Sequence, residues 1–280
     1  MPGQRHESID SLCETVEDTI RLGLGGVLLF GLPAVKDPRG SGAFADAGVI
    51  QETIRALRAR FDDTCVIIAD CCLCEYTDHG HCGLLLENGE VDNDATLELY
   101  GRTAVAQAAA GADIIAPSGM MDGQVAAIRD ALDASGFTDT AILAYSAKFM
   151  TVMYGPFRDA AKSAPRRGDR RSYQMDASNQ REAVREAILD VEEGADMVMV
   201  KPALTYLDVV ARVRDATDLP LAAYCVSGEY AMLRHAAAAG AFDERLAVLE
   251  ALGGIRRAGA DVLITYHARA AATWLAESRR

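Results

Sequence analysis

A short pattern that recurs along the chain limits its fold more than any other feature. The tetrapeptide AGAD stands at 110–113 and again at 258–261, and EGAD stands at 193–196. Each copy follows a helix-like segment, where glycine suits the left-handed backbone at the end of a helix. Each copy also precedes an apolar run without alternation, as is typical of a parallel strand covered on both faces. The pattern therefore predicts alternating helices and parallel strands.

Seven such strands can be placed along the chain. They lie at 25–31, 65–72, 114–117, 141–149, 197–201, 219–228 and 262–266. Amphipathic segments such as 181–193 and 206–216 separate them. Strict alternation of this kind favours a closed (β/α)8 TIM barrel over an open doubly wound sheet, and no dinucleotide-binding G-x-G-x-x-G motif follows the first strand. We therefore expect an α/β fold with one TIM-barrel domain over residues 1–280.

The first unit of this barrel is incomplete. A helix-like stretch at 8–23 precedes every strand, whereas an eight-stranded barrel needs a strand ahead of it. We therefore expect the barrel to lack its first strand and to carry two unpaired strand edges.

The charge and hydropathy of the chain limit the kinds of partner that it can bind and the compartments in which it can function. The net charge of −13 at pH 7 argues against nucleic acid or an anionic membrane as a partner. The one basic cluster, PRRGDRR at 165–171, is too short for a nucleic-acid face. No apolar run is long enough to cross a bilayer, and the first ten residues lack the apolar segment of a signal peptide. We therefore expect a soluble protein of the cytoplasm.

The unusual residues of the chain fall at the ends of the expected strands. These residues are Lys148, Lys201, Ser227, Tyr266 and a cysteine cluster that begins at Cys71. In a barrel of parallel strands these ends meet at one mouth, where the chemistry of such barrels gathers. The sequence therefore predicts a single active site at this mouth.

Lysine is scarce in this chain, and two of its four copies lie in apolar strands. Burial disfavours the ammonium form of Lys148 and Lys201, and a second ammonium nearby disfavours it further. Both effects favour a neutral amine, which is the form that attacks a carbonyl to make a Schiff base. The alternative is that each side chain extends to the surface and pairs with a carboxylate.

The segment CCLCEYTDHGHC at 71–82 carries four of the seven cysteines. An odd total with such clustering favours a metal over disulfides. The thiols of Cys72, Cys74 and Cys82 suit tetrahedral zinc, with the fourth position open to water or to a substrate. The alternatives are a closed structural site completed by a histidine of the same segment, and a cluster of reactive free thiols.

A long segment after Lys148, at 154–178, shows little periodicity and is interpreted as a lid. It carries five arginines, which are Arg158, Arg166, Arg167, Arg170 and Arg171. Arginines on a lid can clamp a carboxylate with two parallel hydrogen bonds as the lid closes. For two or three of these arginines, the alternative is that they only carry solvated charge at the surface.

Several segments of the chain resemble one enzyme family, in order and along the whole length. They are ADCCLCEYTDHGHCG, APSGMMDG, YSAKF, YGPFRDAA, GDRRSYQ, MVMVKPA, VSGEYAM and RAGADVLITY. The family is porphobilinogen synthase, also called 5-aminolevulinate dehydratase. The resemblance implies a lyase that condenses two 5-aminolevulinate molecules into porphobilinogen, with loss of two waters, in the synthesis of haem and other tetrapyrroles.

The resemblance also implies roles for individual residues. Lys201 matches the lysine that forms a Schiff base with the substrate that becomes the propionate side of the product. Lys148 matches the lysine that engages the acetate-side substrate. Cys72, Cys74 and Cys82 match the zinc ligands of the zinc-dependent branch, where the metal assists the acetate-side substrate.

The resemblance supplies anchors for the two substrate carboxylates as well. Arg158 and Arg170 match residues that hold the carboxylate of the acetate-side substrate, and Gln174 lies in the same lid. Ser227 and Tyr266 match the hydroxyls that hold the other carboxylate. Two separate anchors are expected, because each substrate brings its own carboxylate tail.

Four further positions are singled out by the same comparison. Asp70 matches an aspartate beside the zinc segment and is a candidate for proton transfer. Glu186 resembles the residue that binds an allosteric magnesium in some members. Ser172 stands where some members have an extra cysteine, so no second metal site is expected there. Gly119 replaces an aspartate usual in the family, which changes the hydrogen bonding expected at the mouth.

The family's assembly is built by an N-terminal arm that wraps a neighbouring subunit and forms octamers. That arm, like the first strand, is expected to be missing here, so a homo-oligomer is expected but the octamer is in question. Two other interpretations stay open. One is an aldolase or lyase that uses a single lysine on the same barrel, and the other is a shortened, inactive relative that binds metal or ligand without turnover.

Overall fold

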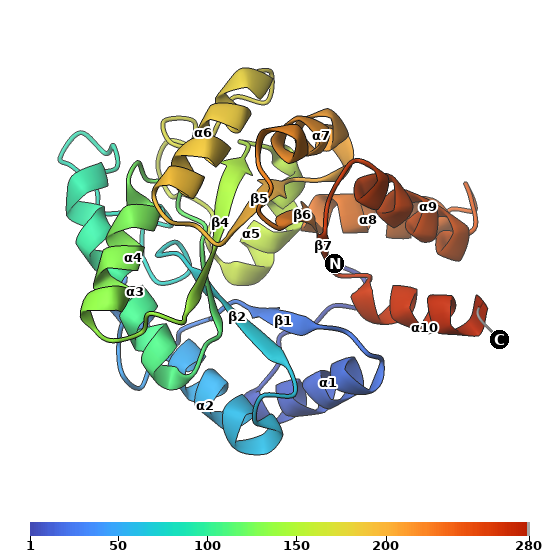
Figure 1. Cartoon of the computed structure of the whole chain (residues 1–280), viewed down its shortest axis with the longest axis horizontal. Coiled ribbons are helices and arrows are strands. Elements are labelled where there is room, and N and C mark those ends of the chain that lie inside the picture. Colours follow the sequence, from blue (N-terminus) through green and yellow to red (C-terminus); the bar gives the residue numbers. More distant parts are fainter. Residues whose placement is uncertain (279–280) are drawn as a thin grey trace.

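Seven parallel strands form one curled sheet at the centre of the molecule (Figure 1). The structure is a computed structural model that describes residues 1–278. The strands are β1 (Gly26–Leu29), β2 (Val66–Cys71), β3 (Ile114–Pro117), β4 (Ala141–Lys148), β5 (Met197–Lys201), β6 (Leu221–Cys225) and β7 (Val262–Thr265). Each strand pairs in parallel with the next one along the chain. The expected α/β fold of the TIM-barrel type is confirmed.

Helices surround the outer side of this sheet (Figure 1). They are α1 (Ile9–Arg21), α2 (Val49–Phe61), α3 (Asn93–Ala110), α4 (Gln124–Ala134), α5 (Gly155–Ala161), α6 (Gln180–Glu192), α7 (Leu207–Ala216), α8 (Ser227–Ala238), α9 (Glu244–Arg257) and α10 (Ala268–Ser278). Short 3-10 turns lie at Ser41–Ala43, Val152–Tyr154 and Leu204–Tyr206. Among residues 1–278, none of the helices is both long and apolar enough to span a membrane.

The glycine of each repeat ends a helix, as the sequence pattern predicts. Gly111, Gly194 and Gly259 have φ angles of 107°, 101° and 120°. A residue with a Cβ atom rarely adopts this left-handed region, whereas glycine enters it without steric penalty. The glycine therefore lets the chain reverse from the helix into the next strand.

The aspartate of each repeat fastens the new strand to its neighbour. One carboxylate oxygen accepts a hydrogen bond from a backbone N–H at the start of the preceding strand: Asp113 from Ile67 at 2.7 Å, Asp196 from Ile142 at 2.8 Å and Asp261 from Leu221 at 3.1 Å. The backbone N–H of each aspartate donates in return to the carbonyl of the same partner residue. The repeat thus sets the register between neighbouring strands.

Alternate strand residues point inward and form the core of the barrel. This inner set includes Leu28, Ile68, Ile114, Leu143, Tyr145, Met199, Tyr224 and Ile264. In β4 the register against β5 shifts between Ala144 and Ala147. This bulge brings both Tyr145 and Lys148 to the inner side, although strict alternation would separate them. The bulge therefore helps to place a lysine at the mouth.

The curled sheet ends at β1 and β7, and within residues 1–278 no ladder of hydrogen bonds joins these two strands. Each of these two strands therefore has one edge without a strand partner among the described residues. Helices from the two ends of the chain lie close together beside this opening, because Arg269 of α10 lies 4.0 Å from Asp18 of α1. The N-terminus lies on the same side (Figure 1).

Candidate active site

The two lysines share one pocket at the mouth of the barrel. Lys148 ends β4, Lys201 ends β5, and the two residues are register partners in the sheet. Their residues are only 5% and 8% exposed. Both amines lie near the Tyr145 ring, at 5.6 Å and 4.8 Å from its centroid. The structure therefore brings together the two amines that the sequence placed at neighbouring strand ends.

The amine of Lys201 lies among aromatic rings. Its Nζ atom is 4.5 Å from the ring centroid of Tyr224 and 5.2 Å from that of Tyr154. Burial lowers the pKa of Lys201 to about 7, with a further lowering from Lys148 and an opposing effect from Asp70. A large fraction of this amine is therefore neutral near neutral pH and able to act as a nucleophile.

The amine of Lys148 lies on the side of the mouth nearer to β3. Its Nζ atom donates a hydrogen bond to the backbone oxygen of Ser118, which follows β3. This contact orients the amine toward the interior of the barrel and away from the surface. Neither lysine forms a salt bridge among the residues that the structure describes, so pairing with a surface carboxylate does not describe them.

Asp70 lies on β2 with its side chain buried at the same mouth. Its Oδ1 atom has no hydrogen-bond partner within residues 1–278. Burial raises the pKa of Asp70 well above its usual range, and the nearby Glu75 and Cys72 raise it further, while Lys201 and Lys148 oppose the shift. A carboxyl group of this kind can hold a proton and release it to a partner.

Three thiols gather beside Asp70. Cys72, Cys74 and Cys82 are buried, and their Sγ atoms all lie within 4.8 Å of one another. The Sγ atoms of Cys72 and Cys74 are 3.4 Å apart. Hydrogen bonds from these two thiols lower the pKa of Cys82 well below its usual range. All seven cysteines are free, and this convergent set of soft donors fits a metal ion.

The two histidines of the cysteine segment are engaged elsewhere. The Nδ1 atom of His81 lies 3.1 Å from the Tyr173 hydroxyl, and its Nε2 atom lies 2.9 Å from the Arg167 carbonyl oxygen. The Nε2 atom of His79 lies 3.2 Å from the Pro38 carbonyl oxygen. These contacts tie the segment to the lid and to a loop, so a closed site with three thiols and one histidine is not favoured.

The lid carries polar atoms that are buried and unpartnered within the described chain. They are Nε of Arg158, Nε of Arg170 and both amide atoms of Gln174. The Nη2 atom of Arg170 donates to the carbonyl oxygens of Gly80 and Ser163 at 2.8 Å and 2.6 Å. Buried groups of this kind normally find a partner, so this set suits a polar ligand. Arg166, Arg167 and Arg171 are exposed, as expected for solvated charge.

Ser227 and Tyr266 follow β6 and β7. The Ser227 hydroxyl accepts a hydrogen bond from the backbone N–H of Phe157 at 3.1 Å and donates to the Met153 carbonyl oxygen at 3.2 Å. The Tyr266 hydroxyl lies 3.3 Å from that of Tyr224, whose ring borders Lys201. These two hydroxyls therefore lie on the Lys201 side of the mouth.

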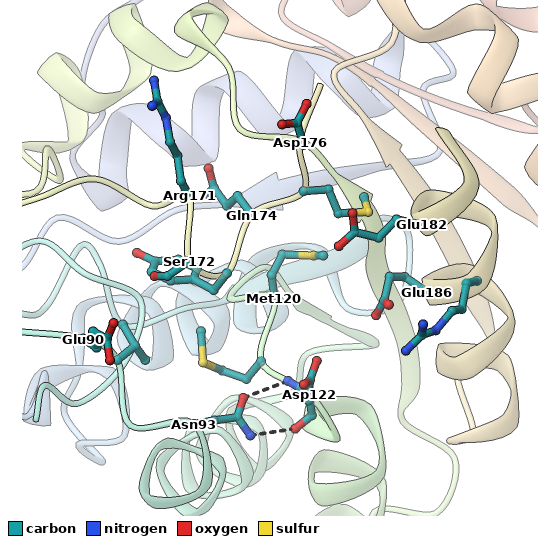
Figure 2. A pocket seen from close by; sticks show the side chains of 15 residues that line it. Glu90, Asn93, Met120, Asp122, Arg171, Ser172, Gln174, Asp176, Glu182 and Glu186 are labelled. Carbon is teal, nitrogen blue, oxygen red and sulfur yellow. Dashed lines mark hydrogen bonds between the residues drawn. The ribbon is translucent and has the colours of Figure 1, made fainter. Parts of the chain in front are cut away.

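Glu186 lies in a separate pocket of about 690 Å³, which Figure 2 shows from close by. It faces this pocket from α6 together with Glu182, and Asp122 lies below Glu186 in this view. Burial raises the pKa of Glu186, with a smaller contribution from Asp122. Ser172 lines the same pocket. The structure does not bring Glu186 to the lysines, and its role toward magnesium stays a prediction.

The glycine at position 119 has a steric explanation. A Cβ atom at Gly119 would lie 1.8 Å from the hydroxyl oxygen of Tyr100. That hydroxyl donates a hydrogen bond to the Cys82 carbonyl oxygen at 2.9 Å and lies 3.7 Å from the Cys72 sulfur. Tyr100 thus occupies the space that an aspartate would need, and it supports the thiol cluster instead.

Two features of the site were missed by the sequence reasoning. One is Glu75, a carboxylate buried beside the thiols, which lies inside the cysteine segment but was not singled out. The other is the set of aromatic rings around Lys201, which are Phe30, Tyr145, Tyr154, Phe157 and Tyr224. Glu75 had a visible signal, because it directly follows Cys74.

The fold and the site together define a class of protein: a TIM-barrel enzyme with two buried lysines beside a cluster of thiols that can hold a metal. A family model described as "Delta-aminolevulinic acid dehydratase" matches residues 1–274. The chain belongs to this family, which confirms the resemblance seen in its motifs.

Curated relatives with the same description cover nearly the whole chain. The relative from Synechococcus elongatus is 56% identical over 279 residues, which are 99% of this chain and 85% of the relative. The relative from Bacillus subtilis is 52% identical over 277 residues, which are 99% of this chain and 85% of that relative. The relative from Escherichia coli is 53% identical over 268 residues, which are 96% of this chain and 82% of that relative.

A solved structure is similar over the same extent. It is delta-aminolevulinic acid dehydratase (porphobilinogen synthase) from Toxoplasma gondii in complex with the reaction product porphobilinogen. The sequences are 46% identical and the TM-score is 0.97, with 99% of this chain and 80% of that chain covered. The likeness therefore extends over nearly all of the strands and helices of this chain.

Proposed function

We propose that this chain is a porphobilinogen synthase that condenses two 5-aminolevulinate molecules into porphobilinogen with loss of two waters. The observation that carries the proposal is the pair of buried amines, Lys148 and Lys201, in register at two neighbouring strand ends. The substrate is a ketone, and two ketones held side by side require two amines. The family of the chain and the names of its relatives support the same reaction.

The chemistry of the lysines follows from their surroundings. The neutral amine of Lys201 adds to the ketone carbon of one substrate, and the carbinolamine loses water to give a Schiff base. Lys148 engages the second ketone in the same way. When the carbon–carbon and carbon–nitrogen bonds of the pyrrole form between the two substrates, both lysines are released, so that two waters leave in total. Asp70 lies on β2 near both amines and is the group that we assign to proton transfer.

The two carboxylate tails are assigned to opposite sides of the mouth. Arg158, Arg170 and Gln174 hold the tail of the acetate-side substrate, which is supported by their buried, unpartnered polar atoms. Ser227 and Tyr266 hold the tail of the propionate-side substrate. This second assignment is supported by the contact of Tyr266 with Tyr224, which borders Lys201. Separate anchors orient the two substrates for one coupling geometry.

We propose zinc as the metal of the thiol cluster. Three thiols are soft donors that select zinc over magnesium or calcium, and Cys72, Cys74 and Cys82 converge without a committed histidine. When bound, zinc supplies a Lewis acid that binds and orients the acetate-side substrate. The protein contributes the thiols, the buried environment and the hydrogen bond from Tyr100 that holds the Cys82 backbone.

Turnover of 5-aminolevulinate by the purified chain tests this function. We expect a pyrrole product in a colour assay, complete loss of activity on Lys201→Ala, and little change on Lys162→Ala, because Lys162 is exposed and lies outside the site. An active Lys201→Ala variant would contradict the assigned role. The interpretation as an inactive relative is not supported, because the two lysines, the thiols and the lid residues are all in place.

The remaining expectations are proposals of the same kind. We propose that the chain acts as a single catalytic domain, supported by one continuous sheet from β1 to β7. A cytoplasmic location is supported by seven free cysteines. A homo-oligomer is supported only by the family resemblance, and the mass in solution measures it.

A further inference from the structure

One buried carboxylate near the Lys201 side of the mouth has no role in the function above. Glu229 is the third residue of α8, and it is 0% exposed. Its Oε1 atom accepts a hydrogen bond from the backbone N–H of Leu204 at 2.7 Å, and its Oε2 atom accepts one from the backbone N–H of Val226 at 2.6 Å. The side chain therefore joins two separate segments of the chain.

These two segments carry groups of the active site. Leu204 lies three residues after Lys201, which ends β5, and Val226 directly precedes Ser227, which begins α8. Lys201 is the proposed nucleophile, and Ser227 is a proposed anchor for the carboxylate of the same substrate. Through the backbone, Glu229 thus connects the amine that receives the ketone to the hydroxyl that receives the carboxylate tail.

Capping of α8 explains only one of the two hydrogen bonds. A glutamate at the third position of a helix commonly accepts a hydrogen bond from the backbone N–H of the N-cap residue, which here is Val226. The hydrogen bond from Leu204 crosses from the loop after β5, so the cap does not require it. This second bond indicates a task beyond the helix itself.

Backbone N–H groups, and not a cation, surround this carboxylate. Among residues 1–278, no lysine, arginine or histidine lies within salt-bridge distance of it. Burial raises the pKa of Glu229, and this shift is opposed by hydrogen bonds from the backbone N–H groups of Val226, Leu204, Ala203 and Thr205. The first turn of a helix also favours a negative charge. A glutamine at this position would turn an N–H donor of its own toward these donors.

The chain at the start of the lid contacts the same two groups through other atoms. The Tyr154 hydroxyl donates a hydrogen bond to the Lys201 carbonyl oxygen at 3.1 Å, and the Ser227 hydroxyl donates one to the Met153 carbonyl oxygen at 3.2 Å. A Cβ atom at Gly228 would lie 2.6 Å from that Met153 oxygen, so α8 begins in close contact with this segment. Lids move during turnover, so a contact outside the lid is needed to keep the two groups at a constant separation.

We propose that Glu229 is a positioning residue that sets the separation between the Lys201 amine and the Ser227 hydroxyl. This inference rests on the roles proposed above for these two residues. In 5-aminolevulinate, two methylene groups separate the ketone carbon from the carboxylate, so one molecule reaches both groups only at a fixed separation. Glu229 acts through the backbone and not on the reacting atoms. Its loss should therefore impair the recognition of a keto acid more than the reaction of Lys201 with a simple ketone.

Borohydride trapping on Lys201 with two probes tests the proposal. One probe is 4-oxopentanoate, which is the substrate without its amino group, and the other is pentan-2-one, which has a methyl group in place of the carboxylate. The full chain is incubated with each probe at the same concentration, and the trapped Lys201 peptide is quantified by mass spectrometry. We expect the natural protein to prefer the keto acid, and Glu229→Gln to lower this preference about ten-fold or more.

Matched variants separate this role from a loss of stability. Glu244→Gln removes a carboxylate from the first turn of α9, where Glu244 pairs with Arg234 at 2.6 Å, and it should leave the preference unchanged. Glu229→Asp keeps the charge but shortens the side chain by one methylene, so it should also lower the preference. This variant decides the question if the glutamine variant does not fold. Thermal unfolding monitors the fold of each variant.

Three results would overturn this inference. They are an unchanged preference in the folded variant at position 229, an equal loss of trapping with both probes, and unfolding of both variants, which would assign Glu229 to stability alone. Other results would instead overturn the proposed function. They are a natural protein that forms no Lys201 adduct or has no preference for the keto acid, and a preference that survives the combined substitutions Ser227→Ala and Tyr266→Phe.

Discussion

At the scale of single residues, the function depends on an amine that is neutral when the substrate arrives. The pKa of Lys201 is lowered to about 7, chiefly by burial. The neutral fraction falls as the pH drops below this value, so we expect kcat/KM to decrease by up to ten-fold per pH unit on the acid side. The pH dependence of kcat/KM measures this limb. A profile that stays flat from about pH 6 to pH 8 would contradict the role of Lys201 as the nucleophile.

The sequence predicts the polar residues of the site for a simple reason: parallel strands of one barrel all end on the same side. Strand order alone therefore brings Lys148, Lys201, Ser227 and Tyr266 to one mouth. The aromatic surroundings of Lys201 could not be predicted in this way, because their residues come from distant segments and look like ordinary core. Glu75 is different, because it directly follows Cys74 inside the cysteine segment and could have been singled out from the sequence.

At the scale of elements, the loop between β3 and α4 depends on a glycine for space. A Cβ atom at Gly119 would lie 1.8 Å from the Tyr100 hydroxyl oxygen and 2.4 Å from the ring carbon that bears it. We expect Gly119→Ala to lower the free energy of unfolding by about 1–3 kcal/mol and to weaken metal binding, because Tyr100 supports the Cys82 backbone. Urea denaturation and zinc competition measure the two effects.

The matched control for this substitution is Gly253→Ala in α9. A Cβ atom at Gly253 meets no atom within 4 Å, and alanine favours a helix over glycine by about 1 kcal/mol. We therefore expect this variant to be at least as stable as the natural protein. Equal stability of the two variants would show that Tyr100 moves aside without penalty, contrary to the steric explanation.

The repeat aspartates make a second prediction at this scale. Asp196 accepts a hydrogen bond from the Ile142 N–H at 2.8 Å. Asp196→Ala should lower the free energy of unfolding by about 1–2 kcal/mol, because this partly buried donor loses its acceptor. Asp196→Asn keeps an acceptor oxygen and should lose less, as urea denaturation would reveal. An alanine variant as stable as the asparagine variant would show that the hydrogen bond between Asp196 and the Ile142 N–H does not stabilise the fold.

The order of helices and strands was predictable because the glycine and the apolar run recur together. The two helical segments expected at 181–193 and 206–216 correspond closely to α6 and α7. Two details were not predictable. The bulge in β4 depends on pairing with β5, and the short helix α5 lies in a segment whose weak periodicity resembles that of a loop.

At the scale of the whole molecule, metal binding should contribute to stability. The thiols join the end of β2 to a turn that also contacts the lid, through His81 and Tyr173. A ligand that binds only the folded state adds about 2.7 kcal/mol at one hundred times its dissociation constant. We therefore expect chelation to lower the midpoint of thermal unfolding, and added zinc to restore it. An unchanged midpoint after complete removal of the metal would contradict this expectation.

The opening between the two ends of the curled sheet is also a feature of the whole molecule. Within the described residues, β1 and β7 stand at the two ends of the sheet. Which helices face the opening was not predictable, because the pattern of one helix does not specify its distant neighbours. The contact between α1 and α10 is such a case.

Trapping of the substrate on the protein tests the central claim most directly. The chain is incubated with saturating 5-aminolevulinate, reduced with borohydride and mapped by peptide mass spectrometry. The two-amine site predicts reduced adducts on both Lys148 and Lys201, with none on the exposed Lys162. Adducts on only one of the two lysines, or on neither, would contradict it.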